Sequence, residues 1–192
     1  LIPLSIHPMF GPGAKKLSDT KLLLVPIRNE NKEKKLVRSL FKGARTIVIK
    51  DPKSHDSIMA IILGMIYYVN LLLASTLSNE NITLLKRVSG TTFYLQKLLF
   101  ESILTDNSSL ISSLLADNKQ LIKHLKKYNE ESARLFDIII KNKNILEKRI
   151  NRIKQSYTNK RNIMVSYEKM YSIISKMYDE WMRCLLNHLD VK

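Results

Sequence analysis

The residue whose type and setting best suit catalysis is His7, in the segment IHPMFGPG, residues 6–13. A neutral imidazole accepts protons near neutral pH, so a histidine held in a fixed position is a candidate general base. The two prolines of the segment fix their own φ angles, and its two glycines relax the backbone where a side chain would clash. The segment therefore predicts a rigid, extended presentation of His7. A histidine beside a proline can also be purely structural.

Metal and disulfide chemistry have little support in the sequence. Cys184 is the only cysteine, so an internal disulfide or a thiolate metal cluster is excluded, and we expect a reducing, cytoplasmic location. The histidines His7, His55, His124 and His188 lack the spacing that a zinc site needs. We therefore predict no metal.

The chain is strongly basic. Its 192 residues include 32 Lys and Arg against 17 Asp and Glu, a formal charge of +15. This charge would suit nucleic acid, an acidic membrane surface or a multiply charged small anion. The lysines are scattered, however, as in NKEKK (31–35) and KNKNILEKRINRIK (141–154), which is typical of solvated helix faces. Nucleic acid is thus the less favoured partner, supported by net charge alone.

The elements that would position His7 begin with short apolar runs. Residues 21–27 (KLLLVPI) and 44–50 (ARTIVIK) predict strands, and the amphipathic stretch between them predicts a helix. Three residues can cap this helix: Asn29 or Asn31 at its start and Gly43 at its end. With a strand ending at His7, these elements leave sheet edges and a face uncovered. We therefore interpret residues 1–50 as the end of a larger α/β domain.

From Pro52 onward every segment has helical periodicity, and Ser54 is the expected N-cap of the first helix. Capping and turn residues separate the predicted helices, which span 54–77, 82–88, 91–104, a segment from 108, and 119–154. The predicted fold class is mainly α, with an all-helical domain over residues 51–192 after the short strand–helix–strand unit.

Two apolar patterns allow more than one interpretation. Residues 58–77 are uncharged and long enough to cross a bilayer, but polar and small residues interrupt them, and we favour a buried core helix and no membrane. Near the C-terminus, apolar residues alternate steps of four and three, at Ile163, Tyr167, Met170, Ile174, Met177, Trp181, Cys184 and His188. This coiled-coil-like seam can pair within the chain or with a second subunit.

Four segments together resemble the prephenate dehydrogenases of tyrosine biosynthesis. They are HPMFGP (7–12), HDSIMAIILGMIYYVN (55–70), SGTTFY (89–94) and TDNSSLISSLLADN (105–118). The resemblance implies an N-terminal Rossmann-type domain that binds NAD or NADP, and a C-terminal helical domain that forms the substrate cleft and a homodimer. The chain's only G-x-G, Gly11 to Gly13, lacks the context of a dinucleotide fingerprint. We therefore expect this chain alone to bind no cofactor and to be inactive by itself.

The implied reaction is the oxidative decarboxylation of prephenate to 4-hydroxyphenylpyruvate, in which hydride passes to the nicotinamide. By its match to the family histidine, His7 would accept a hydrogen bond from the substrate's ring hydroxyl and take its proton. Pro8, Met9 and Gly11, beside it in the motif, are expected to contact the cofactor. His55 also matches a family position, at a helix start, where it either binds an anionic group or packs at the domain junction.

The substrate's two carboxylates call for cations, and here the sequence departs from the family pattern. Glu101 stands where many relatives carry an arginine, which reverses the charge. Lys97 or Arg87 could substitute, although a lysine lacks the bidentate fork of an arginine. Three further positions that are often polar in relatives carry Leu63, Ile66 and Tyr67. The alternative hypothesis is thus a non-catalytic helical dimerisation or interaction module, and prephenate and arogenate both stay open as substrates.

Overall fold

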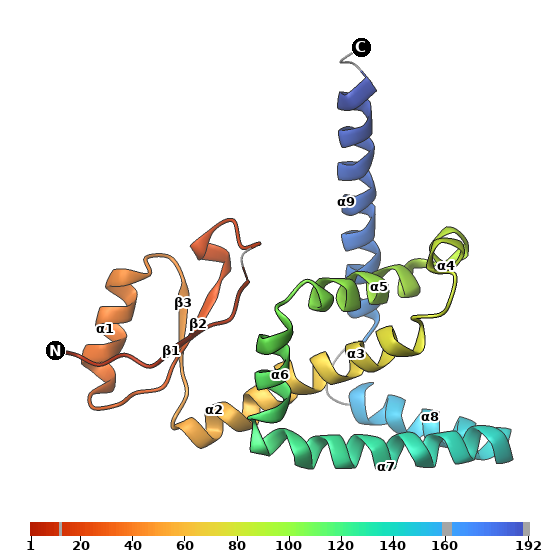
Figure 1. The fold of residues 1–192 in the computed structure, drawn as a ribbon, viewed down its shortest axis with the longest axis horizontal. Helices are drawn as coiled ribbons and strands as arrows, with labels where there is room; N and C mark the ends of the chain where they lie inside the picture. The colour runs from red at the N-terminus through yellow and green to blue at the C-terminus, as the bar shows by residue number, and fades with distance from the viewer. Residues whose placement is uncertain (12, 159–162, 190–192) are drawn as a thin grey trace. The chain divides into compact units, whose positions relative to one another are not determined.

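The computed structural model describes residues 1–11, 13–158 and 163–189, with backbone alone for 177–189. The chain is mainly helical, over 71% of its residues, with a three-stranded mixed sheet near the N-terminus, which confirms the predicted fold class (Figure 1). It divides into two compact units, each described by itself: the first contains residues 1–69 and 106–125, and the second contains residues 70–105 and 126–192.

The sheet of the first unit has the strand order β1-β2-β3, formed by Ile6–Pro8, Lys21–Leu24 and Arg45–Val48. Strand β1 pairs antiparallel to β2, and β2 pairs parallel to β3. Helix α1 (Glu30–Leu40) makes the crossover that a parallel pair requires (Figure 1). Leu22, Leu24 and Val37 are fully buried between strand β2 and this helix, which confirms the predicted strand–helix–strand unit.

The predicted N-cap of α1 is confirmed, whereas Phe41 holds the C-cap position and the predicted Gly43 lies two residues beyond it. Of the two candidate asparagines, Asn29 is the N-cap, and its side chain accepts a hydrogen bond from the third residue of the helix. The buried carboxylate of Glu33 also accepts three backbone N–H bonds, at 2.7 to 2.8 Å, from the residues just before the helix. Gly43 follows the helix with a φ of 94°, a left-handed conformation that favours glycine.

The next helix is continuous in three parts: α2 (Pro52–Met59), a π-helical segment (Ala60–Met65) and α3 (Ile66–Thr76). The prediction of Ser54 as its N-cap is wrong. Asp51 holds that position, because its carboxylate accepts hydrogen bonds from the backbone N–H and the hydroxyl of Ser54, at 2.8 and 2.9 Å. The helix can therefore begin at a proline, whose missing N–H costs nothing in the first turn.

The prediction that this helix is a buried core helix is also wrong for the single chain. Over Pro52–Thr76 it has a mean hydropathy of 2.1 and the length of a membrane span, yet only 22% of its most apolar stretch is buried. Its buried residues include the small Ala60 and Gly64, whereas Ile61 and Ile66 are about half exposed. This helix therefore presents an apolar surface that the described residues leave largely uncovered.

Three shorter helices follow as predicted. They are α4 (Ile82–Val88), α5 (Thr91–Leu104) and α6 (Ser108–Ala116). Asn81 and Asn107 cap the first and the last of them through their side chains, and Gly90 occupies the N-cap of α5. The turn segments predicted from capping residues therefore lie where helices begin.

The prediction of one long helix over 119–154 is wrong, because the helix is interrupted at Asn142. Helix α7 spans Lys119–Lys141 and α8 spans Lys143–Thr158. The side chain of Asn142 accepts hydrogen bonds from the backbone of the two residues after Lys143, at 3.0 and 3.1 Å, and so starts a new helix. Within the second unit, α8 returns alongside α7, since Arg149 contacts Glu131 at 2.6 Å (Figure 1).

Helix α9 (Met164–Leu189) carries the predicted seam. Ile174 is buried and Met170 is half-buried, as a pairing surface requires, whereas Ile163 and Tyr167 are exposed. The remaining seam positions, Met177, Trp181, Cys184 and His188, lie outside the residues whose side chains are described.

Candidate functional site

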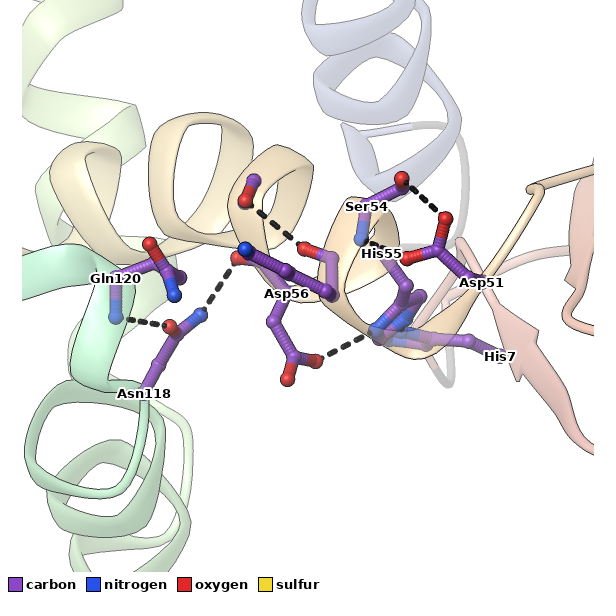
Figure 2. A network of polar contacts seen from close by, with 9 residues as sticks. His7, Asp51, Ser54, His55, Asp56, Asn118 and Gln120 are labelled. Carbon is purple, nitrogen blue, oxygen red and sulfur yellow. Dashed lines mark hydrogen bonds and ion pairs between the residues drawn. The ribbon is translucent and has the colours of Figure 1, made fainter.

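Two histidines from distant parts of the sequence meet within the first unit. His7 lies on strand β1 and His55 lies in the first turn of helix α2, which the cap at Asp51 fixes in place. Nδ1 of His7 is 2.9 Å from Nε2 of His55, and the two ring centroids are 5.2 Å apart (Figure 2). The two positions that the sequence singled out for chemistry are therefore direct partners.

The contact continues from His55 to a carboxylate. Nδ1 of His55 lies 3.0 Å from Oδ1 of Asp56 (Figure 2). The backbone carbonyl of Asp56 accepts a hydrogen bond from the side-chain amide of Asn118, at 2.9 Å. Asn118 in turn accepts one from the backbone N–H of Gln120, at 3.0 Å, so the start of α7 holds this part of α2.

The electrostatics favour an uncharged His7. Burial lowers the pKa of His7 below its ordinary value of 6.5, and the neighbouring His55 lowers it further, because a second positive charge so close is unfavourable. A base must be uncharged to accept a proton. His7 therefore has the protonation state of a base at neutral pH.

Two cavities adjoin this cluster, and His7, His55 and Asp56 line both of them. The larger has a volume of about 410 Å³ and is otherwise lined by α2, the π-helical segment, α6 and the start of α7, at Met59, Leu63, Leu110, Ser113, Leu114, Asp117 and Asn118. The smaller, about 370 Å³, is otherwise lined by Ser5, Ile6, Val25 and Pro52. A mostly apolar wall with a few convergent polar groups is typical of a small-molecule site.

The predicted cations lie in the second unit. Lys97, in α5, is nearly buried, with 9% of its surface exposed, and its ammonium forms an ion pair with Glu101 one turn further on. Arg87 is exposed in the last turn of α4. Neither is among the lining residues of the two cavities described above, whose charged groups are Asp56 and Asp117.

The residues predicted to contact a cofactor directly follow His7. Pro8 ends strand β1 and is exposed, while Met9 donates its backbone N–H to the carbonyl of Lys21 at 2.9 Å. Gly11 is exposed, and a Cβ added there would meet no atom within 4 Å. The backbone at Gly11 is therefore open to an approaching ligand.

Sequence reasoning missed two polar residues of the cluster, Asp56 and Asn118. Each was available in the quoted motifs, as the Asp of HD and the Asn of ADN. It also missed the partner of Tyr67, whose hydroxyl donates to the carboxylate of Asp106 at 2.5 Å. Burial and this carboxylate raise the pKa of Tyr67 to about 12. Among the described residues, no group of three or more His, Cys, Asp and Glu is arranged to hold a metal ion.

Comparison with known proteins points to one family. The family model described as "Prephenate dehydrogenase, dimerization domain" matches residues 51–155. A probable arogenate/prephenate dehydrogenase of Methanocaldococcus jannaschii is 32% identical over 79 residues, which cover 40% of this chain and 18% of that protein. The chain thus corresponds to a small part of that relative.

Solved structures share the fold. Synechocystis arogenate dehydrogenase superposes with a TM-score of 0.57 at 16% identity, over 81% of this chain and 60% of that one. Prephenate dehydrogenase from A. aeolicus, in complex with hydroxyphenyl propionate and NAD+, gives a TM-score of 0.58 at 18% identity, over 81% and 58%. The chain spans about 60% of the length of these structures. Since the family model covers more than half of the chain, this protein belongs to the prephenate dehydrogenase dimerization-domain family.

Proposed function

We propose that this chain is the substrate-binding and dimerisation part of a prephenate or arogenate dehydrogenase. Residues 1–50 form the end of its cofactor-binding α/β domain, and residues 51–192 form the helical domain. The observation that carries the proposal is the contact of 2.9 Å between His7 and His55 at the wall of two cavities. A structural histidine would not need a second imidazole from another element at its ring nitrogen, nor a cavity beside it.

His7 would act as the base through Nε2, because His55 occupies its Nδ1. The carbon that bears the ring hydroxyl of the substrate loses a hydride, and the hydroxyl proton moves to Nε2 of His7. The ring carboxylate then leaves as CO₂, and the electrons of the broken bond enter the ring, which becomes aromatic. The phenolate oxygen takes the proton back, so His7 ends uncharged and the reaction produces no net proton.

NAD or NADP, when bound, would supply the hydride acceptor for this reaction. We assign Pro8, Met9 and Gly11 to contacts with it, since Pro8 and Gly11 are exposed and a Cβ at Gly11 would meet no atom within 4 Å. The phosphates of a dinucleotide need free N–H groups at a strand-to-helix turn. In the turn between β2 and α1, the buried Glu33 already takes three N–H groups. We therefore assign the phosphate contacts to other residues of the complete enzyme.

The described charged groups that line the two cavities are acidic, so the carboxylates of the substrate require cations that do not line these cavities. We retain Lys97 and Arg87 as substrate-binding candidates, and His55 as a residue that lines the site. Lys97 would have to exchange its ion pair with Glu101 for a bond to substrate. Arg87 is exposed and has the bidentate geometry that carboxylates favour.

The experiment is a kinetic comparison in the complete enzyme that contains this chain, with prephenate and arogenate and with NAD and NADP. We expect His7→Asn to lower kcat by ~10²- to 10⁴-fold with little change in KM, since a positioned base contributes about this much. His124→Asn is the control, because His124 lies on α7 and lines neither cavity. Full turnover by His7→Asn would refute the assignment. A folded wild-type enzyme without turnover of either substrate would favour the non-catalytic module.

We further propose that the protein forms a homodimer through its helical domain. The exposed apolar surface of the helix from Pro52 to Thr76 is the supporting observation, since monomers rarely leave such a surface bare. On this proposal a second copy, not a membrane, covers it, and the protein is cytoplasmic. Sedimentation equilibrium without detergent should give twice the chain mass. A monomer that partitions into vesicles would contradict this.

A further inference from the structure

The two histidines and the carboxylate form a directional chain of hydrogen bonds, from Asp56 through His55 to His7 (Figure 2). A carboxylate only accepts hydrogen bonds, so the proton between Asp56 and His55 belongs to Nδ1 of His55. With both rings uncharged, Nε2 of His55 is then an acceptor. The proton between the two rings must therefore sit on Nδ1 of His7.

This order of donors determines which nitrogen of His7 is free. A neutral imidazole has one N–H and one lone pair, and the partner of one nitrogen fixes the state of the other. Because Nδ1 of His7 carries the proton, Nε2 carries the lone pair. We infer that Asp56 acts through His55 as a positioning residue that sets the tautomer of His7 and leaves Nε2 as the proton acceptor. The inference rests on the proposed function, in which that nitrogen is the base.

The surrounding structure fixes the geometry of these hydrogen bonds between Asp56, His55 and His7. His55 is mostly buried, with 21% of its side chain exposed, and the cap at Asp51 fixes the turn of helix that carries it. The backbone of Asp56 is tied to the side chain of Asn118, from the start of α7. The carboxylate of Asp56 is more open to water, with 59% of its side chain exposed. Because solvent weakens a hydrogen bond to an exposed carboxylate, we expect Asp56 to contribute less than His55.

The first test is direct and uses the chain itself. In a sample labelled with ¹⁵N histidine at pH 7.5, two-bond ¹H–¹⁵N correlations distinguish a protonated from an unprotonated ring nitrogen. We expect a protonated Nδ1 and an unprotonated Nε2 for His7, identified by its absence in His7→Asn. A proton on Nε2 of His7 in the wild-type chain would overturn the inference without any further variant.

Variants then test the role of each partner. His55→Leu removes the acceptor, and Asp56→Ala removes the group that orients it, so both should return His7 to the Nε2-protonated tautomer. His55→Gln and Asp56→Asn each keep a carbonyl oxygen that can accept in the same place, and should preserve the wild-type tautomer. Asp137→Asn is the matched control, because its carboxylate is similarly exposed at 61% but lies elsewhere, paired with Lys141.

Kinetics of the complete enzyme give an independent readout. We expect His55→Leu to lower kcat by about 10- to 100-fold and Asp56→Ala to lower it by a smaller factor within that range, by analogy with the loss on removing the hydrogen-bond partner of a metal-bound histidine. KM should change little, and the two conservative variants should restore most of kcat. Unchanged turnover in His55→Leu and Asp56→Ala, with His7→Asn inactive, would refute the positioning role of His55 and Asp56. It would leave the proposed function intact. Full turnover in His7→Asn would refute the proposed function itself.

Discussion

Close packing of Gly64 against Leu121, next to the wall of the larger cavity, can be tested by measuring the stability of variants. Gly64 lies in the π-helical segment, one residue after Leu63 of the larger cavity, and Leu121 lies in the first turn of α7. A Cβ added to Gly64 would come within 2.8 and 2.9 Å of the two terminal carbons of Leu121 and within 3.3 Å of its Cγ. Leu121 is fully buried, so it has no open space to move into.

The magnitudes follow from two opposing effects. Gly64→Ala adds a methyl group to a filled site, which costs about 1 to 3 kcal/mol, but alanine favours the helix by about 1 kcal/mol. The net loss of stability should be about 0 to 2 kcal/mol. Leu121→Ala alone should cost about 2 to 5 kcal/mol, because it leaves a cavity. In the double variant the new methyl group meets no clash, so it should be about 1 to 3 kcal/mol more stable than the sum of the single changes.

Urea unfolding of the four proteins, followed by far-UV circular dichroism, measures this coupling. Gly13→Ala is the control, because a Cβ there meets no atom within 4 Å, and it should leave the free energy of unfolding within about 0.5 kcal/mol of wild type. Losses that add to within about 0.5 kcal/mol in the double variant would refute the close packing of Gly64 on Leu121.

Changes at three further positions test single hydrogen-bonded contacts elsewhere in the chain. Three backbone N–H bonds lower the pKa of Glu33 below 4.5, so its contribution to stability is complete above that pH and is lost as the pH falls through the lowered value. Glu33→Gln should therefore lower the urea midpoint at pH 7, by an amount that shrinks as the pH falls below 4.5, and an equal effect at every pH would contradict this. Tyr67→Phe removes the bond to Asp106 and should cost about 1 to 3 kcal/mol in urea unfolding, whereas an unchanged midpoint would count against that bond. Asn142→Ala should cost about 1 kcal/mol by removing the cap of α8, and Asn142→Asp should restore it; equal midpoints for all three proteins would argue against the cap.

Most of the fold could be predicted because local signals agree with it. Short apolar runs predicted the strands, helical periodicity predicted the shorter helices, and capping residues predicted most of their ends. The long helix was predicted wrongly because residues 119–154 keep one amphipathic period through Asn142, and an asparagine within a helix is common enough to be tolerated. Whether it instead caps a second helix depends on tertiary contacts such as that of Arg149 with Glu131.

The site could be predicted only in part. The motif around His7 and the position of His55 identified both histidines, but no spacing rule places residues 48 positions apart at 2.9 Å. Asp56 was harder to predict, because neighbouring residues on a helix do not normally face each other. Its contact with His55 depends on side-chain rotamers. The prediction that the apolar helix from Pro52 to Thr76 is buried failed for a different reason. An apolar sequence does not indicate whether residues of the same chain cover it.

The ion pair of Lys97 with Glu101 explains how the chain accommodates an acidic residue at the position where the family resemblance predicts an arginine. A lysine with only 9% of its surface exposed needs a counter-charge, and a glutamate four residues later on the same helix face supplies one. An arginine at position 101 would instead place two cations one turn apart, one of them almost without water. The two residues therefore depend on each other: Glu101→Arg would add a cation without this conflict only when Lys97 is also replaced by an uncharged side chain.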